Sequence, residues 1–99
     1  MTEQEGRDYI VRLEQKTLKD DNYNRALEDD NNWDIGKSFD EEELERLVEM
    51  ADVGNKQAMY DTAAVFTLIA HELKKQNELH KSFLVYIRAL LWIDEAQKA

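Results

Sequence analysis

The sequence has no cysteine, no proline and only three glycines among its 99 residues. Without cysteine, the chain has no disulfide, no thiolate nucleophile and no cysteine-ligated metal, which fits a reducing compartment, and we expect a cytoplasmic protein. Few residues interrupt helices, and no apolar run approaches the ~20 residues that cross a bilayer. These absences predict a small, all-α protein without a membrane segment.

The apolar periodicity predicts a compact bundle of about five helices in one domain, residues 1–99. Apolar residues make up 42% of the chain, which is enough for a small core. Short connections predict antiparallel helix hairpins. We expect N-terminal capping helices and an acidic loop over residues 1–37, and a three-helix core over 38–99. The predicted helices run from about residue 3 to 18, around 23–27, from 38 to about 51, from 56 to 75 and from 78 to 96, with a loop over 31–37.

Helix ends can be predicted from a few capping and turn residues. Thr2 and Ser38 each stand three residues before a glutamate, which is the capping-box pattern of a helix start. Gly54 suits a helix C-terminus, and Asn55 can cap the helix that follows. Gly36 is expected to provide a positive φ inside the loop.

The excess of negative charge lies in the first half of the chain. Residues 1–52 contain seventeen Asp and Glu against seven Lys and Arg, whereas residues 53–99 contain five against six. A one-sided field of this kind attracts a cationic partner and speeds its encounter. It opposes an anionic membrane surface and direct nucleic-acid binding. We therefore expect a basic protein partner; the oligomeric state is left open.

An aromatic residue, Trp33, lies among the acids of the predicted loop. Helix capping explains acids in a first turn, but it does not explain four acids around a tryptophan, a pattern typical of a binding hot spot with a charged rim. The alternative is that Trp33 anchors the loop to the core and the acids only solvate the surface. The predicted partner-binding residues are Glu28, Asp29, Asp30, Trp33, Asp34, Glu41, Glu42 and Glu45.

The acidic loop also carries part of a calcium-binding pattern. Counted from Asp30, the ligands Asn32, Asp34 and Glu41 fall at the third, fifth and twelfth positions of an EF-hand. Ile35 replaces the glycine that the sharp turn needs at the sixth position. A plain acidic loop is the preferred interpretation, and calcium binding is left open.

No constellation of catalytic residues is present in the sequence. The two histidines, His71 and His80, have no ligands at metal-binding spacing. Paired acids are frequent, but they lie in runs rather than across a cleft, and no glycine-rich phosphate loop occurs. We expect a non-catalytic protein that needs no metal or cofactor.

From Ser38 onward, small residues and an aromatic recur at set steps. The spacing resembles Sel1-like repeats, which are relatives of the tetratricopeptide family, over roughly residues 38–97. Such a resemblance implies antiparallel helix pairs that serve protein–protein contact. In size and acidity the chain is also similar to immunity proteins. The positions that match the repeat are Ala51, Gly54, Asn55, Ala58, Ala63 and Phe66.

Three functions are compatible with these patterns. The first is an inhibitor or immunity protein that neutralises a basic toxin enzyme such as a nuclease, because nucleases expose Lys and Arg for phosphate. The second is a repeat-type adaptor that holds a peptide or helix between the last three helices, with Met59, Phe83 or Trp92 exposed. The third is a DNA mimic, whose carboxylates replace phosphates on a DNA-binding protein.

Overall fold

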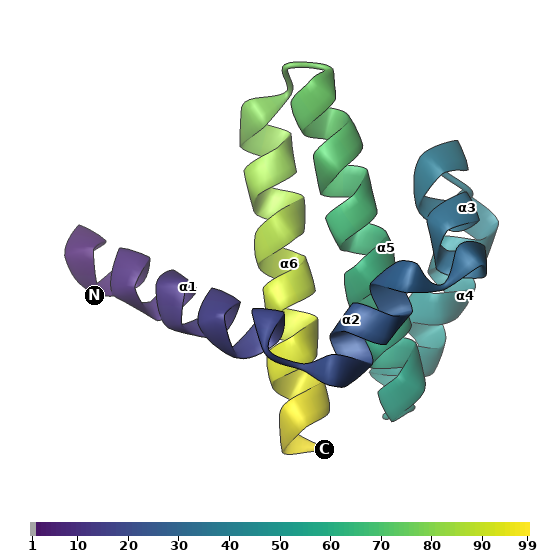
Figure 1. Cartoon of the computed structure of the whole chain (residues 1–99), viewed down its shortest axis with the longest axis horizontal. Helices are drawn as coiled ribbons and strands as arrows, with labels where there is room; N and C mark the ends of the chain where they lie inside the picture. The colour runs from purple at the N-terminus through teal and green to yellow at the C-terminus, as the bar shows by residue number, and fades with distance from the viewer. Residues whose placement is uncertain (1) are drawn as a thin grey trace.

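The computed structural model describes residues 2–99 and forms an all-α globule, with no strand in this part of the chain (Figure 1). The all-α prediction is confirmed, but the described residues contain six helices where five were expected. Every helix within residues 2–99 is too short or too polar to cross a lipid bilayer. The helices are α1 (Glu3–Leu18), α2 (Asp21–Glu28), α3 (Asp30–Ser38), α4 (Glu41–Asp52), α5 (Lys56–Lys75) and α6 (Leu79–Lys98).

Helix α5 is the centre of the bundle. It packs against α2, α3, α4 and α6, and its antiparallel pairing with α6 is the most extensive (Figure 1). Ala63, Ala64 and Val65 are completely buried, because small side chains on adjacent faces let several helices approach one axis. The prediction of a central helix over residues 56–75 is confirmed.

The predicted loop over residues 31–37 is wrong, because these residues form helix α3. The Asp29 side chain caps this helix by accepting hydrogen bonds from the backbone N–H groups of Asn31 and Asn32. Ile35 is 4% exposed and packs in a core cluster with residues of α4 and α5. Capping and tertiary packing thus outweigh the weak helix propensity of asparagine, aspartate and glycine.

Gly36 does not have the positive φ that the loop prediction assigned to it. It lies inside α3 and is buried. A Cβ added at this position would lie 2.7 Å from the Cβ of Leu68 on α5. Glycine is therefore required here for the close approach of two helices rather than for a turn.

The predicted helix ends are confirmed at three positions and wrong at one. Thr2 caps α1, Asn55 caps α5, and Gly54 has a φ of 95°. Ser38 does not begin a helix, because it is the last residue of α3. Asp40 caps α4 instead, accepting a hydrogen bond from the backbone N–H of Glu43 at 3.2 Å.

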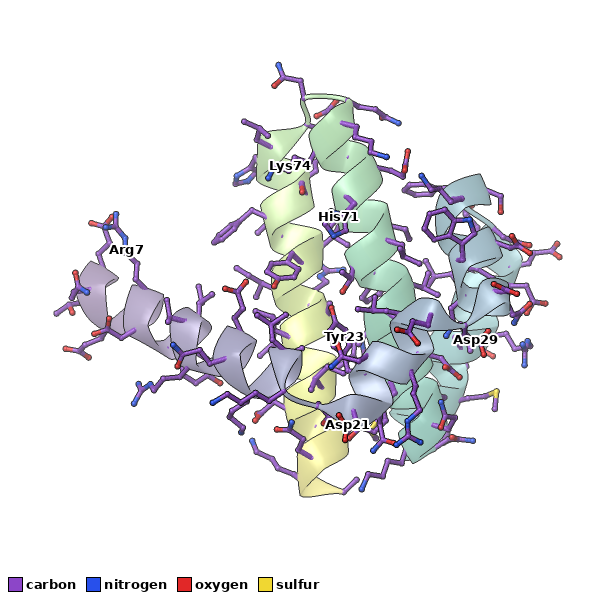
Figure 2. All side chains as sticks on the ribbon, viewed as in Figure 1. Arg7, Asp21, Tyr23, Asp29, His71 and Lys74 are labelled. Carbon is purple, nitrogen blue, oxygen red and sulfur yellow. The ribbon has the colours of Figure 1, made fainter. Side chains whose placement is uncertain are left out.

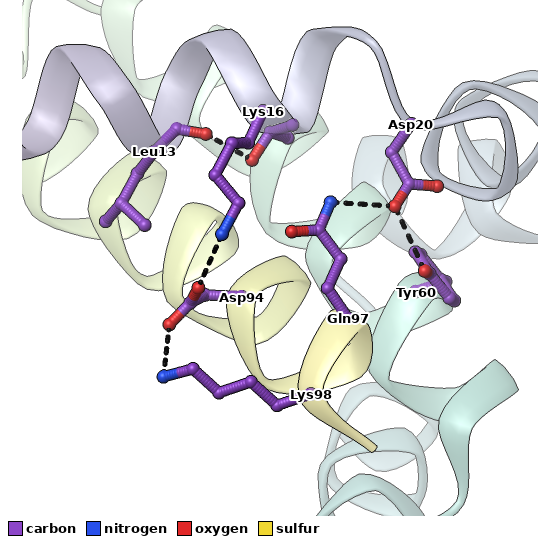
Figure 3. Close-up of polar contacts among 8 residues, drawn as sticks. Leu13, Lys16, Asp20, Tyr60, Asp94, Gln97 and Lys98 are labelled. Atoms are coloured by element: carbon purple, nitrogen blue, oxygen red, sulfur yellow. Dashed lines mark hydrogen bonds and ion pairs between the residues drawn. The ribbon is translucent and has the colours of Figure 1, made fainter.

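Asp20 fixes the corner between α1 and α2 to the central helices. Its side chain caps α2 and also accepts hydrogen bonds from the Tyr60 hydroxyl of α5 and the Gln97 amide of α6, both at 3.0 Å (Figure 3). Burial raises the pKa of Asp20, but the hydrogen bonds from Gln97, Tyr60 and the backbone outweigh burial and leave the pKa below its ordinary value.

Asp94 of α6 makes a second fixed contact with α1. It is 8% exposed, and its two carboxylate oxygens pair with Lys98 at 2.9 Å and with Lys16 at 3.2 Å (Figure 3). The hydrogen bond from Lys98 is the main reason that the pKa of Asp94 is lowered, and burial acts against it. On this side of the molecule, acids are used to hold helices together.

Candidate functional site

Residues 28–52, called the acidic segment below, carry the excess charge of the chain. They comprise the last residue of α2, helices α3 and α4 and their connections, and they contain eleven Asp and Glu against two Lys and Arg. This balance of −9 equals the net charge of the whole chain, so the remaining residues are neutral in sum. In Figure 1 this segment and α1 lie on opposite sides of the α5–α6 pair.

Helix α3 presents one solvent-facing stripe of Asp30, Trp33, Asp34 and Lys37. These residues are spaced at i, i+3, i+4 and i+7, which places them on one face. The Lys37 ammonium lies 4.9 Å from the centroid of the Trp33 ring. Trp33 is 47% exposed, so the alternative that it anchors the segment to the core is wrong; Ile35 has that role.

Helix α4 carries a second acidic stripe along its length. Glu41, Glu45 and Glu49 follow one another at i, i+4 and i+8, and all three are exposed. Acids in the first turn stabilise a helix, but Glu49 and Asp52 stand at its C-terminal end, where the helix dipole disfavours negative charge. Like charges at i, i+4 also repel one another. This helix is thus less stable than its length and apolar face would allow.

Nearly all acids of the acidic segment lack an internal counter-ion. Within residues 2–99, Glu43 is the one acid of the segment in an ion pair, at 2.8 Å from Arg46. The other base, Lys37, pairs at 2.5 Å with Glu72 of α5, and this contact raises the pKa of Lys37 and lowers that of Glu72. The other ten carboxylates of the acidic segment are exposed and have no ion-pair partner within residues 2–99.

All eight predicted partner-binding residues are exposed in the structure. They do not converge in one pocket, because Asp30, Trp33 and Asp34 lie on α3 and three of the glutamates lie on α4, whereas Glu28 ends α2. Asp29 also has a structural role as the cap of α3. The residues concerned are Glu28, Asp29, Asp30, Trp33, Asp34, Glu41, Glu42 and Glu45.

Phe39 is a candidate contact that the sequence did not suggest. It connects α3 to α4 with a φ of 58° and is 48% exposed. A bulky residue rarely adopts this left-handed conformation, which glycine or asparagine tolerates better. From sequence, an apolar residue directly before the cap of a helix indicates a packing contact with its first turns. An exposed aromatic ring on a strained backbone points instead to use of the side chain at a surface.

The calcium-loop alternative does not fit the structure. Asp30, Asn32 and Asp34 are carried by helix α3, and Asn32 is buried and donates to the carbonyl of Ala26 and to Asp61. Glu41 begins the next helix. Over the described range, 2–99, no three His, Cys, Asp or Glu side chains are arranged to hold a metal ion.

A groove of about 530 Å³ lies on another face of the bundle. The end of α1, α2 and the facing sides of α5 and α6 form its walls; Tyr23, His71 and Lys74 mark it in Figure 2. The adaptor hypothesis placed a groove between the last three helices, with Met59, Phe83 or Trp92 exposed. Of the three side chains that this hypothesis expected to be exposed, Met59 is 7% exposed and Trp92 packs against the core, whereas Phe83 is 52% exposed and lines the groove. The groove shares α5 and α6 with the expected one, but α1 and α2 take the place of α4 in its walls.

Comparisons with known proteins do not assign this chain to a family. No family model, no curated protein and no solved structure matches it. The functional argument therefore depends on the acidic segment and the groove themselves.

Proposed function

We propose that this protein is a non-catalytic, acidic binding domain that uses its acidic segment to neutralise a basic protein, as an inhibitor or immunity protein does to a nuclease toxin. The observation that carries the proposal is the placement of Glu49 and Asp52 at the C-terminal end of α4. Acids there lower the stability of the helix, so stability does not explain them and docking to a cationic partner does.

The acidic segment supplies the two components that such docking needs. Ten outward carboxylates provide a field that accelerates encounter with a cationic surface. Trp33 and Phe39, each about half exposed, provide aromatic area that a partner can bury. Association is expected to be fast and dependent on salt, with the aromatic contacts setting the dissociation rate.

The test compares two variants that remove the same charge. The first carries Asp30→Asn, Asp34→Asn, Glu45→Gln and Glu49→Gln, and leaves the caps Asp29 and Asp40 intact. The matched control neutralises four exposed acids elsewhere, by Glu5→Gln, Asp8→Asn, Asp21→Asn and Glu95→Gln. Each protein is used to capture partners from the native host at ~50 mM and ~500 mM salt, and the rate of association with the captured protein is measured.

We expect the variant of the acidic segment to associate at least about tenfold more slowly at low salt, while the control matches the wild type. The captured protein should be basic, and the wild-type domain should inhibit its nuclease activity. Equal loss in both variants would contradict a defined docking surface. Displacement of the captured partner by duplex DNA would favour the DNA-mimic function instead.

A helix-binding adaptor is the second candidate function. The groove between the end of α1, α2, α5 and α6 is the observation that favours it, since its lining is largely apolar and Leu18, Leu79 and Phe83 in it are each more than half exposed. The Sel1-like pattern stays a prediction, because helix pairing alone does not distinguish a repeat from another helical bundle.

A further inference from the structure

One face of α6 is covered by α1, but only along the C-terminal part of α6. Leu79, Phe83, Tyr86, Leu90 and Asp94 follow one another at three- and four-residue steps, so they form a single stripe. The lower part of the stripe contacts α1, because Tyr86 donates a hydrogen bond to Glu14 and Asp94 pairs with Lys16; Leu90, between them, is 1% exposed. The upper part has no such cover: Leu79 is 58% exposed and Phe83 52%.

We propose that the groove over this upper stripe binds an amphipathic α-helix of a partner protein, with apolar residues toward α6 and an acidic flank toward His71 and Lys74. The proposal deepens the second candidate function and does not depend on the acidic segment. It follows from continuity, because the same stripe of α6 already holds one helix.

The size and exposure of the groove favour a helix over a small molecule. A volume of about 530 Å³ lies within the usual range of ligand pockets. A compact ligand filling it would leave the outer surfaces of Leu79, Phe83 and Leu18 wet, and Leu18 is 57% exposed. A helix laid along α6 covers all three, as in other helix-in-groove complexes.

Charge around the groove selects an acidic partner. His71 and Lys74, one turn apart on α5, are the basic side chains that line it (Figure 2). Glu14 of α1 accepts a hydrogen bond at 2.5 Å from the hydroxyl of Tyr86, which lines the groove. Burial and this contact raise the pKa of Tyr86, so the hydroxyl keeps its proton and continues to satisfy the carboxylate. No Asp or Glu is among the residues that line the groove within residues 2–99, so Lys74 gives its lining a positive charge.

The experiment uses two designed, fluorescein-labelled 18-residue helical peptides with identical leucine faces. One carries glutamate on both flanks and the other carries lysine. The net charge of −9 favours the lysine peptide over the whole molecule, so preference for the glutamate peptide reports on the groove alone. We expect the glutamate peptide to bind at least about tenfold more tightly, with amide shifts in ¹H–¹⁵N spectra confined to the end of α1 and to α2, α5 and α6.

Matched substitutions separate the groove from the rest of the surface. Phe83→Lys should weaken binding about tenfold or more, whereas Leu84→Lys, at a neighbour that is 48% exposed and outside the groove, should not. Lys74→Glu should remove the preference for the glutamate peptide, and Lys56→Glu at the other end of α5 should preserve it.

Three results would overturn the inference. They are absence of binding by both peptides, equal sensitivity to Phe83→Lys and Leu84→Lys, and a concentration-dependent dimer that Phe83→Lys dissociates, since the last would assign the groove to a second copy of the chain. Binding of the lysine peptide with shifts on α3 and α4 would instead concern the acidic segment. The two proposals therefore fail independently.

Discussion

Acids are used in opposite ways on the two sides of this molecule. Asp20 and Asp94 are held by hydrogen bonds and ion pairs between helices, and their pKa values are lowered. The carboxylates of α3 and α4 face outward, and within residues 2–99 only Glu43 of that segment has an ion-pair partner. The same residue type thus stabilises one region and lowers the stability of the other. This contrast supports the proposal that the acidic segment binds a partner, because only its caps Asp29 and Asp40 and the ion pair of Glu43 serve the fold.

The largest loss of stability is expected from removing Asp20, whose carboxylate is hydrogen-bonded to α5 and α6. Asp20→Ala removes the cap of α2 and leaves the Tyr60 hydroxyl and the Gln97 amide without their acceptor. We expect a loss of about 3 kcal/mol in the free energy of unfolding, measured by urea denaturation. The exposed neighbour provides the control: Asp21→Ala should change stability by less than about 0.5 kcal/mol. Equal losses would mean that the contacts of Asp20 contribute little.

A somewhat smaller loss is expected where α3 meets α5. Gly36→Ala places a methyl group 2.7 Å from the Cβ of Leu68, an atom that cannot move without its backbone. We expect about 2 kcal/mol of destabilisation despite the better helix propensity of alanine. Asn31→Ala, on the exposed face of the same helix, should be neutral or slightly stabilising. A Gly36→Ala protein as stable as the wild type would contradict the close approach of α3.

Acid should remove part of the stability that Asp20 and Asp94 provide. Both pKa values are lower in the folded protein than the ordinary 3.8. Their contribution is therefore complete above that value and is lost as the pH falls through the folded-state pKa values. We expect a smaller loss than either substitution above causes, because a protonated carboxyl keeps some hydrogen bonds. Urea titrations between about pH 5 and about pH 2 should show a shallower decline in Asp94→Asn than in the wild type.

The smallest expected effect has the opposite sign and lies in the acidic segment. Glu49→Gln with Asp52→Asn removes two charges that oppose the dipole of α4. We expect a gain of about 0.5 kcal/mol at low salt that disappears at high salt, together with slower association with the captured partner. A loss of stability would show that these two acids stabilise the folded protein, and their placement would no longer support binding to a partner.

Much of the fold could be predicted from the sequence because its signals are local. Thr2, Gly54 and Asn55 mark helix ends by their own chemistry, and α5 has an apolar face long enough to indicate a buried helix. Helix α3 could not be predicted this way. Five of its nine residues are asparagine, aspartate or glycine, which are poor helix formers. Its stability depends on the packing of Ile35 and Gly36 against neighbouring helices, which no local pattern reveals.

The candidate site was predictable in charge but not in shape. The acids around Trp33 are visible in the sequence, whereas their arrangement as two helical stripes depends on α3 being a helix. Phe39 could not be predicted as a contact, because its exposure results from a left-handed backbone at the α3–α4 connection. The groove also depends on the direction in which α1 leaves α6, which is set by contacts far apart in the chain.

Confining the whole charge excess to residues 28–52 gives the molecule a permanent electrical polarity. In the field of a cationic body it will rotate before it touches, so α3 and α4 arrive first. On an anion-exchange resin, the same electrostatic orientation should attach the domain through α3 and α4 and leave α1 pointing into the buffer. A tag or tether placed at the N-terminus would then stay accessible while the carboxylates are engaged.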